Sequence, residues 1–108
     1  MQEVFVVRVH TQRMENSIMP DTMHDAYATC YVLSADYEDA VKRILKKLLS
    51  DGLYPAEILP TIMKLAINDW HIHSKEQWGL YAGELPDQDE FVQKMNCGEV
   101  VYGLFAGY

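Results

Sequence analysis

The sequence predicts an α+β fold: a two-layer sandwich in the order β-β-α-β-α-β, ferredoxin-like in its general layout. Two β-rich segments open the chain at residues 3–12 and 25–34, an amphipathic helix follows at residues 36–51, and the last ten residues are again rich in Val, Tyr and Phe. A helix between two strands implies a right-handed crossover packed on one face of a sheet. The chain of 108 residues fits a single domain, residues 1–108.

The first two strands are indicated by composition and by alternation. Residues 3–12 contain four valines and one phenylalanine, which is typical of a largely buried strand. Residues 25–34 alternate bulky side chains such as Tyr27 and Tyr31 with small ones such as Ala28. The second strand is therefore expected to be bulky on one face and small on the other, and a loop is expected to join it to the first.

The segment at residues 36–51, DYEDAVKRILKKLLSD, gives the clearest local signal. Its apolar residues repeat at helical spacing and form one stripe, while its four basic residues lie on the opposite face. Asp36 is placed to cap the first amides, and Gly52 stands where a residue in the left-handed conformation ends a helix. These features predict an amphipathic helix with these two ends.

The second half of the chain is predicted to add a strand, a helix and a final strand. Pro60 argues against a helix interior, so residues 61–67 are assigned to a third strand. Asp87 followed by Glu90 is the pattern of a capping box and predicts a short helix over residues 88–96. The ending GEVVYGLFAGY supplies the last strand, in which the internal glycines mark bulges or close approaches.

The net charge of −7 is concentrated in the second half of the chain. Residues 51–108 contain nine acidic residues against three lysines, whereas residues 1–50 are nearly balanced. Contacts to phosphate groups need clustered Lys and Arg. The balance of charge therefore disfavours nucleic acid and anionic membrane surfaces, and it favours a basic protein partner.

Other features restrict location and chemistry. No apolar run is long enough to span a bilayer, and the first residues lack the basic and apolar regions of a signal peptide, so a cytoplasmic location is expected. The two cysteines lack the spacing of a disulfide framework or a zinc knuckle. The six glycines are scattered singly, without a phosphate-binding motif, and neither cysteine has the setting of an activated nucleophile. We therefore expect no cofactor and no enzymatic activity.

The stretch DWHIHSKEQWG contains two of the four histidines and both tryptophans of the chain. If it were an extended strand, Asp69, His71 and His73 would project to one face about 7 Å apart and could hold a metal ion. His24 and Asp25 could supply a further ligand. The spacing is common in half-buried strands, however, so a solvated strand face or a partner surface is the preferred interpretation.

A partner surface is predicted over residues 69–90, where aromatic residues and an acidic run occur together. Large aromatic side chains anchor protein interfaces, and an acidic rim steers a basic partner. Two alternatives stay open: a tryptophan of this stretch can belong to the core, and the acids at residues 87–90 can serve as helix caps. The predicted partner-binding residues are Asp69, Trp70, His71, His73, Trp78, Tyr81, Glu84, Asp87, Asp89 and Glu90.

The acidic single domain, the order of strands and helices, the helix DYEDAVKRILKKLLSDGL and the ending GEVVYGLFAGY together resemble the small bacterial immunity proteins of polymorphic or contact-dependent toxin systems. The resemblance implies a non-enzymatic inhibitor that binds a cognate toxin, often a nuclease, and covers its basic active site or an adjacent surface with acidic and aromatic side chains. It assigns no individual residue. We expect a monomer or a homodimer. The alternative is a small dimeric α+β-barrel enzyme, or a metal-binding protein, that uses His71 or His73.

Overall fold

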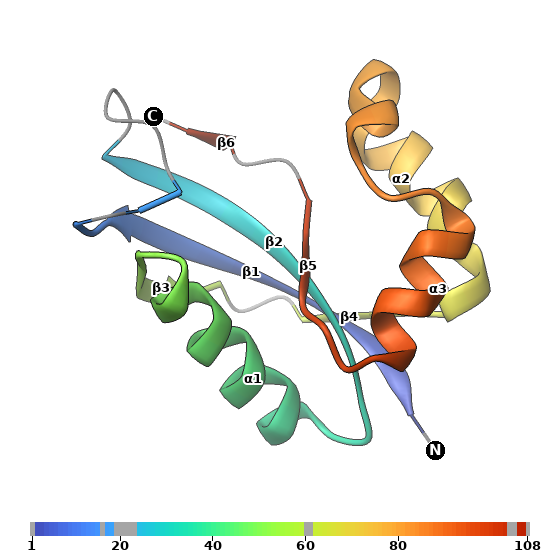
Figure 1. The fold of residues 1–108 in the computed structure, drawn as a ribbon, viewed down its shortest axis with the longest axis horizontal. Coiled ribbons are helices and arrows are strands. Elements are labelled where there is room, and N and C mark those ends of the chain that lie inside the picture. Colours follow the sequence, from blue (N-terminus) through green and yellow to red (C-terminus); the bar gives the residue numbers. More distant parts are fainter. Residues whose placement is uncertain (1, 16, 19–23, 60–61, 104–105, 108) are drawn as a thin grey trace.

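The computed structural model describes residues 2–15, 17–18, 24–59, 62–103 and 106–107, apart from the side chains of residues 80–82 and 106–107. Its strands are β1 (Glu3–Arg13), β2 (Asp25–Ser34), β3 (Leu53–Ile58), β4 (Met63–Leu65), β5 (Val101–Tyr102) and β6 (Ala106–Gly107). They pair antiparallel in the order β3-β1-β2-β5, with β4 also on β1 and β6 also on β2 (Figure 1). The long hairpin of β1 and β2 is the centre of this sheet.

The described helices are α1 (Tyr37–Ser50), α2 (Trp70–Trp78) and α3 (Gln88–Asn96), with the 3-10 turns η1 (Ile67–Asp69) before α2 and η2 (Gly79–Glu84) after it. The Asp36 carboxylate accepts a hydrogen bond from the backbone N–H of Asp39 at 2.8 Å, and the Asp87 carboxylate accepts one from that of Glu90 at 2.8 Å. Both predicted N-caps are thereby confirmed. Within the described chain, helices are too short or too polar to cross a bilayer.

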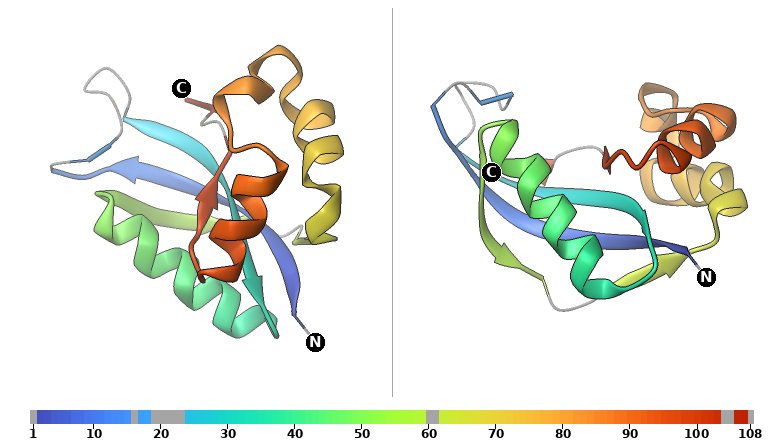
Figure 2. Two further views of the ribbon diagram at one scale, coloured as in Figure 1. Left: turned by 45° about the vertical axis from the view of Figure 1, so that its right-hand side comes forward. Right: turned by 60° about the horizontal axis from the view of Figure 1, so that its bottom comes forward.

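The sheet has an apolar layer on each face. Residues opposite one another in an antiparallel pair share a face, and successive residues alternate between faces. Val7 and Cys30 therefore lie on one face, where Ile44 of α1 packs in the same core cluster. Val6 and Tyr31 lie on the other face, in a cluster with residues of α2 and α3. These two helices stand together near the beginning of β1, apart from α1 (Figure 2).

The structure confirms the α+β class and the helix at residues 88–96, but it corrects the predicted layout. The helices lie on both faces of the sheet, so the ferredoxin-like two-layer sandwich and the order β-β-α-β-α-β are not what the structure has. The physical reason lies in β1, where four consecutive buried residues, Val4 to Val7, need cover on both faces. Within the described part of the predicted third strand at residues 61–67, only the short β4 is a strand, and the structure adds β3 before Pro60, which was not predicted.

Helices α2 and α3 cover only part of their face of the β1–β2 hairpin. Beyond Val6, this face of β1 continues with Arg8, which is exposed, and His10. Thr29 and Tyr27 stand opposite them on β2, and Tyr27 is 39% exposed. An open, partly polar stretch of sheet therefore adjoins the layer formed by α2 and α3, and a cleft forms at this boundary.

Candidate functional site

The segment of residues 69–73, which was considered as an extended strand, forms the end of η1 and the beginning of helix α2. Residues in an α-helix are rotated by about 100° each, so His71 and His73 point in directions about 200° apart. Asp69 lies before them at the end of η1 and is exposed. The predicted alignment of Asp69, His71 and His73 is therefore wrong. Among the described residues, no cluster of three or more His, Cys, Asp or Glu side chains is placed to hold a metal ion.

Trp70 is a core residue and not part of the surface. Its side chain is fully buried, and its ring stacks on that of Phe91 with centroids 4.1 Å apart. Its indole N–H donates a hydrogen bond to the Pro86 carbonyl oxygen at 2.8 Å. Trp70 thereby joins α2 to α3, and the prediction that it contacts a partner directly is corrected.

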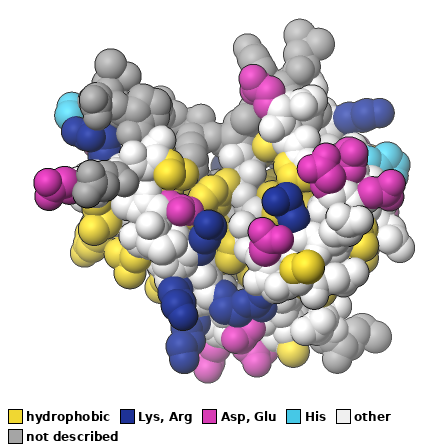
Figure 3. All heavy atoms as spheres, in the orientation of Figure 1, with side chains coloured by type: hydrophobic (Ala, Val, Ile, Leu, Met, Phe, Trp, Pro, Cys, Tyr) yellow, Lys and Arg dark blue, Asp and Glu magenta, His cyan; other side chains and the backbone are white. Residues whose placement is uncertain are grey.

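The acidic run lies on the surface of the same helical layer. Glu84, Asp87, Asp89 and Glu90 are all exposed, and acidic side chains gather over the α2 and α3 side of the molecule in Figure 3. A groove of about 380 Å³ runs between α2 and residues 83–90, with His71, Asp87 and Glu90 among its lining residues. The structure thus brings these three predicted residues together. The side chain of Tyr81 lies outside the described residues.

His71 and the start of α3 are joined through one side chain. The Gln88 side-chain oxygen accepts a hydrogen bond from the backbone N–H of His71 at 2.9 Å, and the His71 ring lies 3.1 Å from the same oxygen. The Gln88 amide nitrogen donates to the Ile67 carbonyl oxygen at 2.9 Å. This bridge holds the acidic beginning of α3 at a fixed position beside α2.

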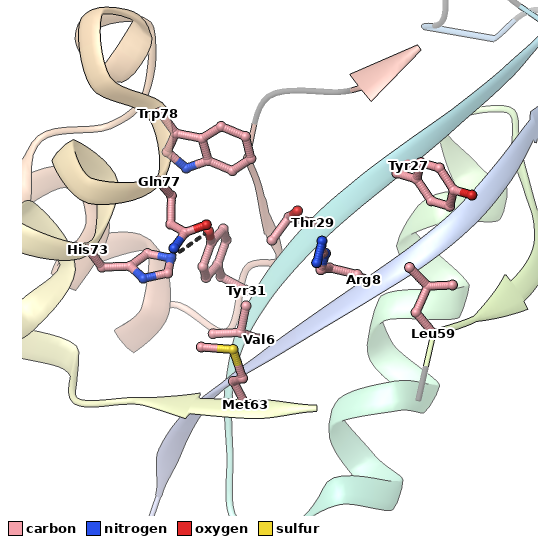
Figure 4. A pocket seen from close by; sticks show the side chains of 10 residues that line it. All are labelled: Val6, Arg8, Tyr27, Thr29, Tyr31, Leu59, Met63, His73, Gln77 and Trp78. Atoms are coloured by element: carbon pink, nitrogen blue, oxygen red, sulfur yellow. Dashed lines mark hydrogen bonds between the residues drawn. The ribbon is translucent and has the colours of Figure 1, made fainter. Parts of the chain in front are cut away.

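A second cleft, of about 300 Å³, lies between α2 and the open part of the sheet (Figure 4). His73 and Trp78 reach it from α2, and Tyr31 and Arg8 reach it from the central hairpin. Two of the predicted site residues, His73 and Trp78, therefore belong to this cleft and not to the acidic groove. The described residues that line it are Val6, Arg8, Tyr27, Thr29, Tyr31, Leu59, Met63, His73, Gln77 and Trp78.

Tyr31 and His73 form a hydrogen-bonded pair in this cleft, with the Tyr31 hydroxyl oxygen 2.8 Å from His73 Nε2. Burial raises the pKa of Tyr31 to about 12, and burial also lowers the pKa of the half-buried His73. At neutral pH the tyrosine is therefore protonated and the imidazole is uncharged. The Tyr31 hydroxyl then donates its proton to Nε2, and the proton of the imidazole is on Nδ1.

Trp78 closes one side of the cleft by packing against a glycine. A Cβ atom added to Gly103 would lie 2.5 Å from Cζ2 of the Trp78 ring, so only glycine leaves room for the ring there. The close approach that was predicted for a glycine of the last strand is thereby confirmed at this position. The Trp78 indole N–H is buried, and no described residue accepts a hydrogen bond from it.

The His73 imidazole makes stability depend on pH. Its pKa is lowered by burial, with Glu76 partly opposing the change, so the unfolded chain binds the proton first as the pH falls. We expect the free energy of unfolding to decrease as the pH drops below about 6.5, the ordinary value for histidine. The decrease should stop once folded His73 is protonated as well. Urea unfolding between pH 7.5 and about 5 measures this slope.

A matched pair of variants separates His73 from the other titrating groups. His73→Gln keeps an acceptor for the Tyr31 hydroxyl and should remove the part of the slope that His73 causes. His71→Gln, on the exposed side of the same helix, should retain the wild-type slope. Equal slopes for both variants would contradict a role of His73 in the pH dependence.

Comparison with known proteins adds no further information on this site. No protein-family model matches the chain, and searches of curated proteins and of solved structures found no match.

Proposed function

We propose that this chain is a non-enzymatic protein that neutralises a cognate basic toxin, such as a nuclease domain, by tight protein–protein binding. The observation that supports this most is the exposed acidic run beside the groove between α2 and α3. No ion pair joins Glu84, Asp87, Asp89 or Glu90 to another side chain among the described residues. Their charge is therefore available to a partner with a basic surface.

The distribution of charge over the molecule supports an oriented encounter. Residues 67–99 contain seven acidic residues and two lysines, whereas α1 carries four basic and two acidic residues. Since α1 packs on the opposite face of the sheet from α2 and α3, its basic residues are separated from the acidic residues of the α2 and α3 layer. A basic partner is therefore attracted mainly to the side formed by α2 and α3, which increases the rate of productive association.

An apolar contact is also available on the acidic layer. Ile72 of α2 is 49% exposed, and helical spacing places it on the same side as Asp69 and Glu76. Stable interfaces usually combine such a desolvated apolar centre with a charged rim. We therefore assign Ile72, with Asp69 and Glu76 beside it, to a further contact on the outer side of α2, away from the groove-lining side of this helix.

The proposal predicts a specific effect of charge reversal. Glu84→Lys combined with Asp89→Lys should reduce the association rate with the partner at least about tenfold at low salt and flatten its salt dependence. The measurement starts with capture of the partner from a lysate of the source organism by the tagged wild-type chain. Surface plasmon resonance with the purified partner then gives the rates.

The control is a second double variant, Glu38→Lys with Glu57→Lys, which changes the net charge by the same amount. Glu38 lies in the first turn of α1, as Asp89 lies in the first turn of α3, so the helix-dipole effects of the two are similar. This variant should associate nearly as fast as the wild type. A captured partner that is not basic, or equal rates for the two double variants, would contradict the proposal.

The alternative of a small enzyme has one supporting observation, the hydrogen bond between His73 and Tyr31 in the second cleft. A neutral imidazole beside a tyrosine hydroxyl is able to move a proton at a bound ligand. His71 lies outside this cleft. If the chain is an enzyme, His73→Gln should abolish its turnover, and the chain should not bind a toxin. If it is the proposed inhibitor, His73→Gln should inhibit the toxin as fully as the wild type.

A further inference from the structure

The lining of the cleft between α2 and the open sheet differs in charge from the rest of the molecule. The chain contains 16 Asp and Glu residues, yet none of them is among the described residues that line the cleft. Arg8 is the one charged side chain among these lining residues. In a chain with a net charge of −7, a cleft with a cation and no carboxylate is a local exception.

Arg8 is available to a ligand. It lies on β1 directly opposite Thr29, at the position after Val6 where the cover by α2 ends. It is exposed, and within the described part of the chain its guanidinium group forms neither an ion pair nor a hydrogen bond. An arginine can bind a carboxylate through two parallel N–H bonds, which gives a strong and oriented contact.

Further hydrogen-bond donors face the same cleft. The Trp78 ring lines the cleft, but its indole N–H is buried and lies on the side of the ring next to Gln77 and Tyr31 in Figure 4, so it is not a donor to a ligand beside Arg8. The Thr29 hydroxyl and the Gln77 amide also line the cleft and make no side-chain hydrogen bond to another described residue. The Tyr31 hydroxyl, in contrast, is already held by His73. Arg8 and Thr29, opposite one another on β1 and β2, therefore supply neighbouring donors for a ligand with acceptor atoms.

The rest of the lining is apolar. Val6 and Met63 lie together on one side of Arg8, and Leu59 and the Tyr27 ring lie beyond Arg8 in Figure 4. The volume of about 300 Å³ is at the lower end of the range for small-molecule sites. It suits a ligand with a single ring or a short branched chain.

We propose that this cleft binds a small organic anion, a carboxylate attached to an apolar body, with Arg8 as the counter-ion and the Thr29 hydroxyl, opposite Arg8 on the central hairpin, as a second donor. This site is separate from the acidic groove, so it is an additional binding activity and does not depend on the proposed function. The apolar body of the ligand lies against Val6 and Met63.

Phenylacetate and its neutral amide, phenylacetamide, test the proposal because they share a shape and differ in charge. The indole N–H signals of the two tryptophans are followed in a proton–nitrogen correlation spectrum of the full chain. Phenylacetate should shift the Trp78 signal with a dissociation constant in the millimolar range. The Trp70 signal should stay in place, because that N–H is already bonded to Pro86. Phenylacetamide should bind at least about tenfold more weakly.

The role of Arg8 is tested with two arginines of the same strand. Arg8→Gln should weaken phenylacetate binding at least about tenfold. Arg13→Gln removes the same charge from β1 outside the cleft lining and should leave the affinity unchanged. The proposal is overturned if phenylacetate does not shift the Trp78 signal, if the amide binds equally well, or if the two arginine variants have the same affinity.

Discussion

Replacing Trp70 by Ala is expected to lower the free energy of unfolding by about 4 kcal/mol, within the range for truncation of a buried large aromatic side chain. The Trp70 ring is fully buried, stacks on Phe91 and meets the Tyr31 ring edge-on at a centroid distance of 4.9 Å. Its removal leaves a cavity between the sheet, α2 and α3. Because small domains have only about 5–15 kcal/mol of stability, the variant should be close to unfolding.

Trp70→Phe separates the two contributions of this side chain. Phenylalanine keeps the stacking on Phe91 but loses the N–H that binds the Pro86 carbonyl oxygen, so the expected loss is about 1–2 kcal/mol. Urea unfolding followed by far-ultraviolet circular dichroism measures both variants. A loss below about 2 kcal/mol for Trp70→Ala would contradict the central position of this ring in the second core cluster.

Elements with local signals were predictable from the sequence. The helices α1 and α3 begin at aspartates whose side chains cap the first turn, and both helices present buried residues at helical spacing. Strand β2 was predictable from its alternation of small and bulky residues. Its small residues Ala26 and Ala28 belong to the core cluster that α1 joins. In each case the information lies within about 15 residues of sequence.

Helix α2 could not be predicted because its local signals are absent. Asp69 makes no capping hydrogen bond through its side chain, and Trp70, Ile72 and Trp78 do not repeat on one face. The helix is instead fixed by tertiary contacts of Trp70 with the sheet and with α3. The alternation of His71 and His73 therefore had the pattern of a strand, although tertiary packing makes this segment a helix.

Of the two candidate sites, the acidic surface was predictable from local sequence signals and the second cleft was not. The exposure of Glu84, Asp87, Asp89 and Glu90 follows from their composition and from the capping pattern, so the acidic surface was predictable. The second cleft was not, since Tyr31 and His73 are 42 positions apart and meet only through the packing of α2. A usable signal was present in β1, where the apolar alternation gives way to Arg8 after Val6 on the same face.

Replacing Gly52 by Ala is expected to lower the free energy of unfolding by about 3 kcal/mol. Gly52 has a φ of +77°, and a Cβ in this left-handed conformation costs about 1 kcal/mol or more. The added Cβ would also lie 2.5 Å from Ser17 Cα, a backbone atom that cannot rotate away. Overpacking of this kind typically costs about 1–3 kcal/mol in addition. The Gly52 carbonyl oxygen accepts from the Met14 N–H at 2.9 Å, so the clash would also disturb the attachment of the segment after β1.

Gly98→Ala is a matched control, because Gly98 has nearly the same φ, +78°. A Cβ there meets only Arg43 Nη2, at 3.3 Å, and this side-chain end, which donates to the Gly98 carbonyl oxygen at 2.6 Å, needs to shift by only a few tenths of an ångström. The expected loss is therefore about 1 kcal/mol, the cost of the left-handed backbone alone. The difference between the two variants in urea unfolding measures the close packing of residue 17 against Gly52. Equal losses would mean that the segment after β1 moves away without cost, and that the turn between α1 and β3 does not hold it in place.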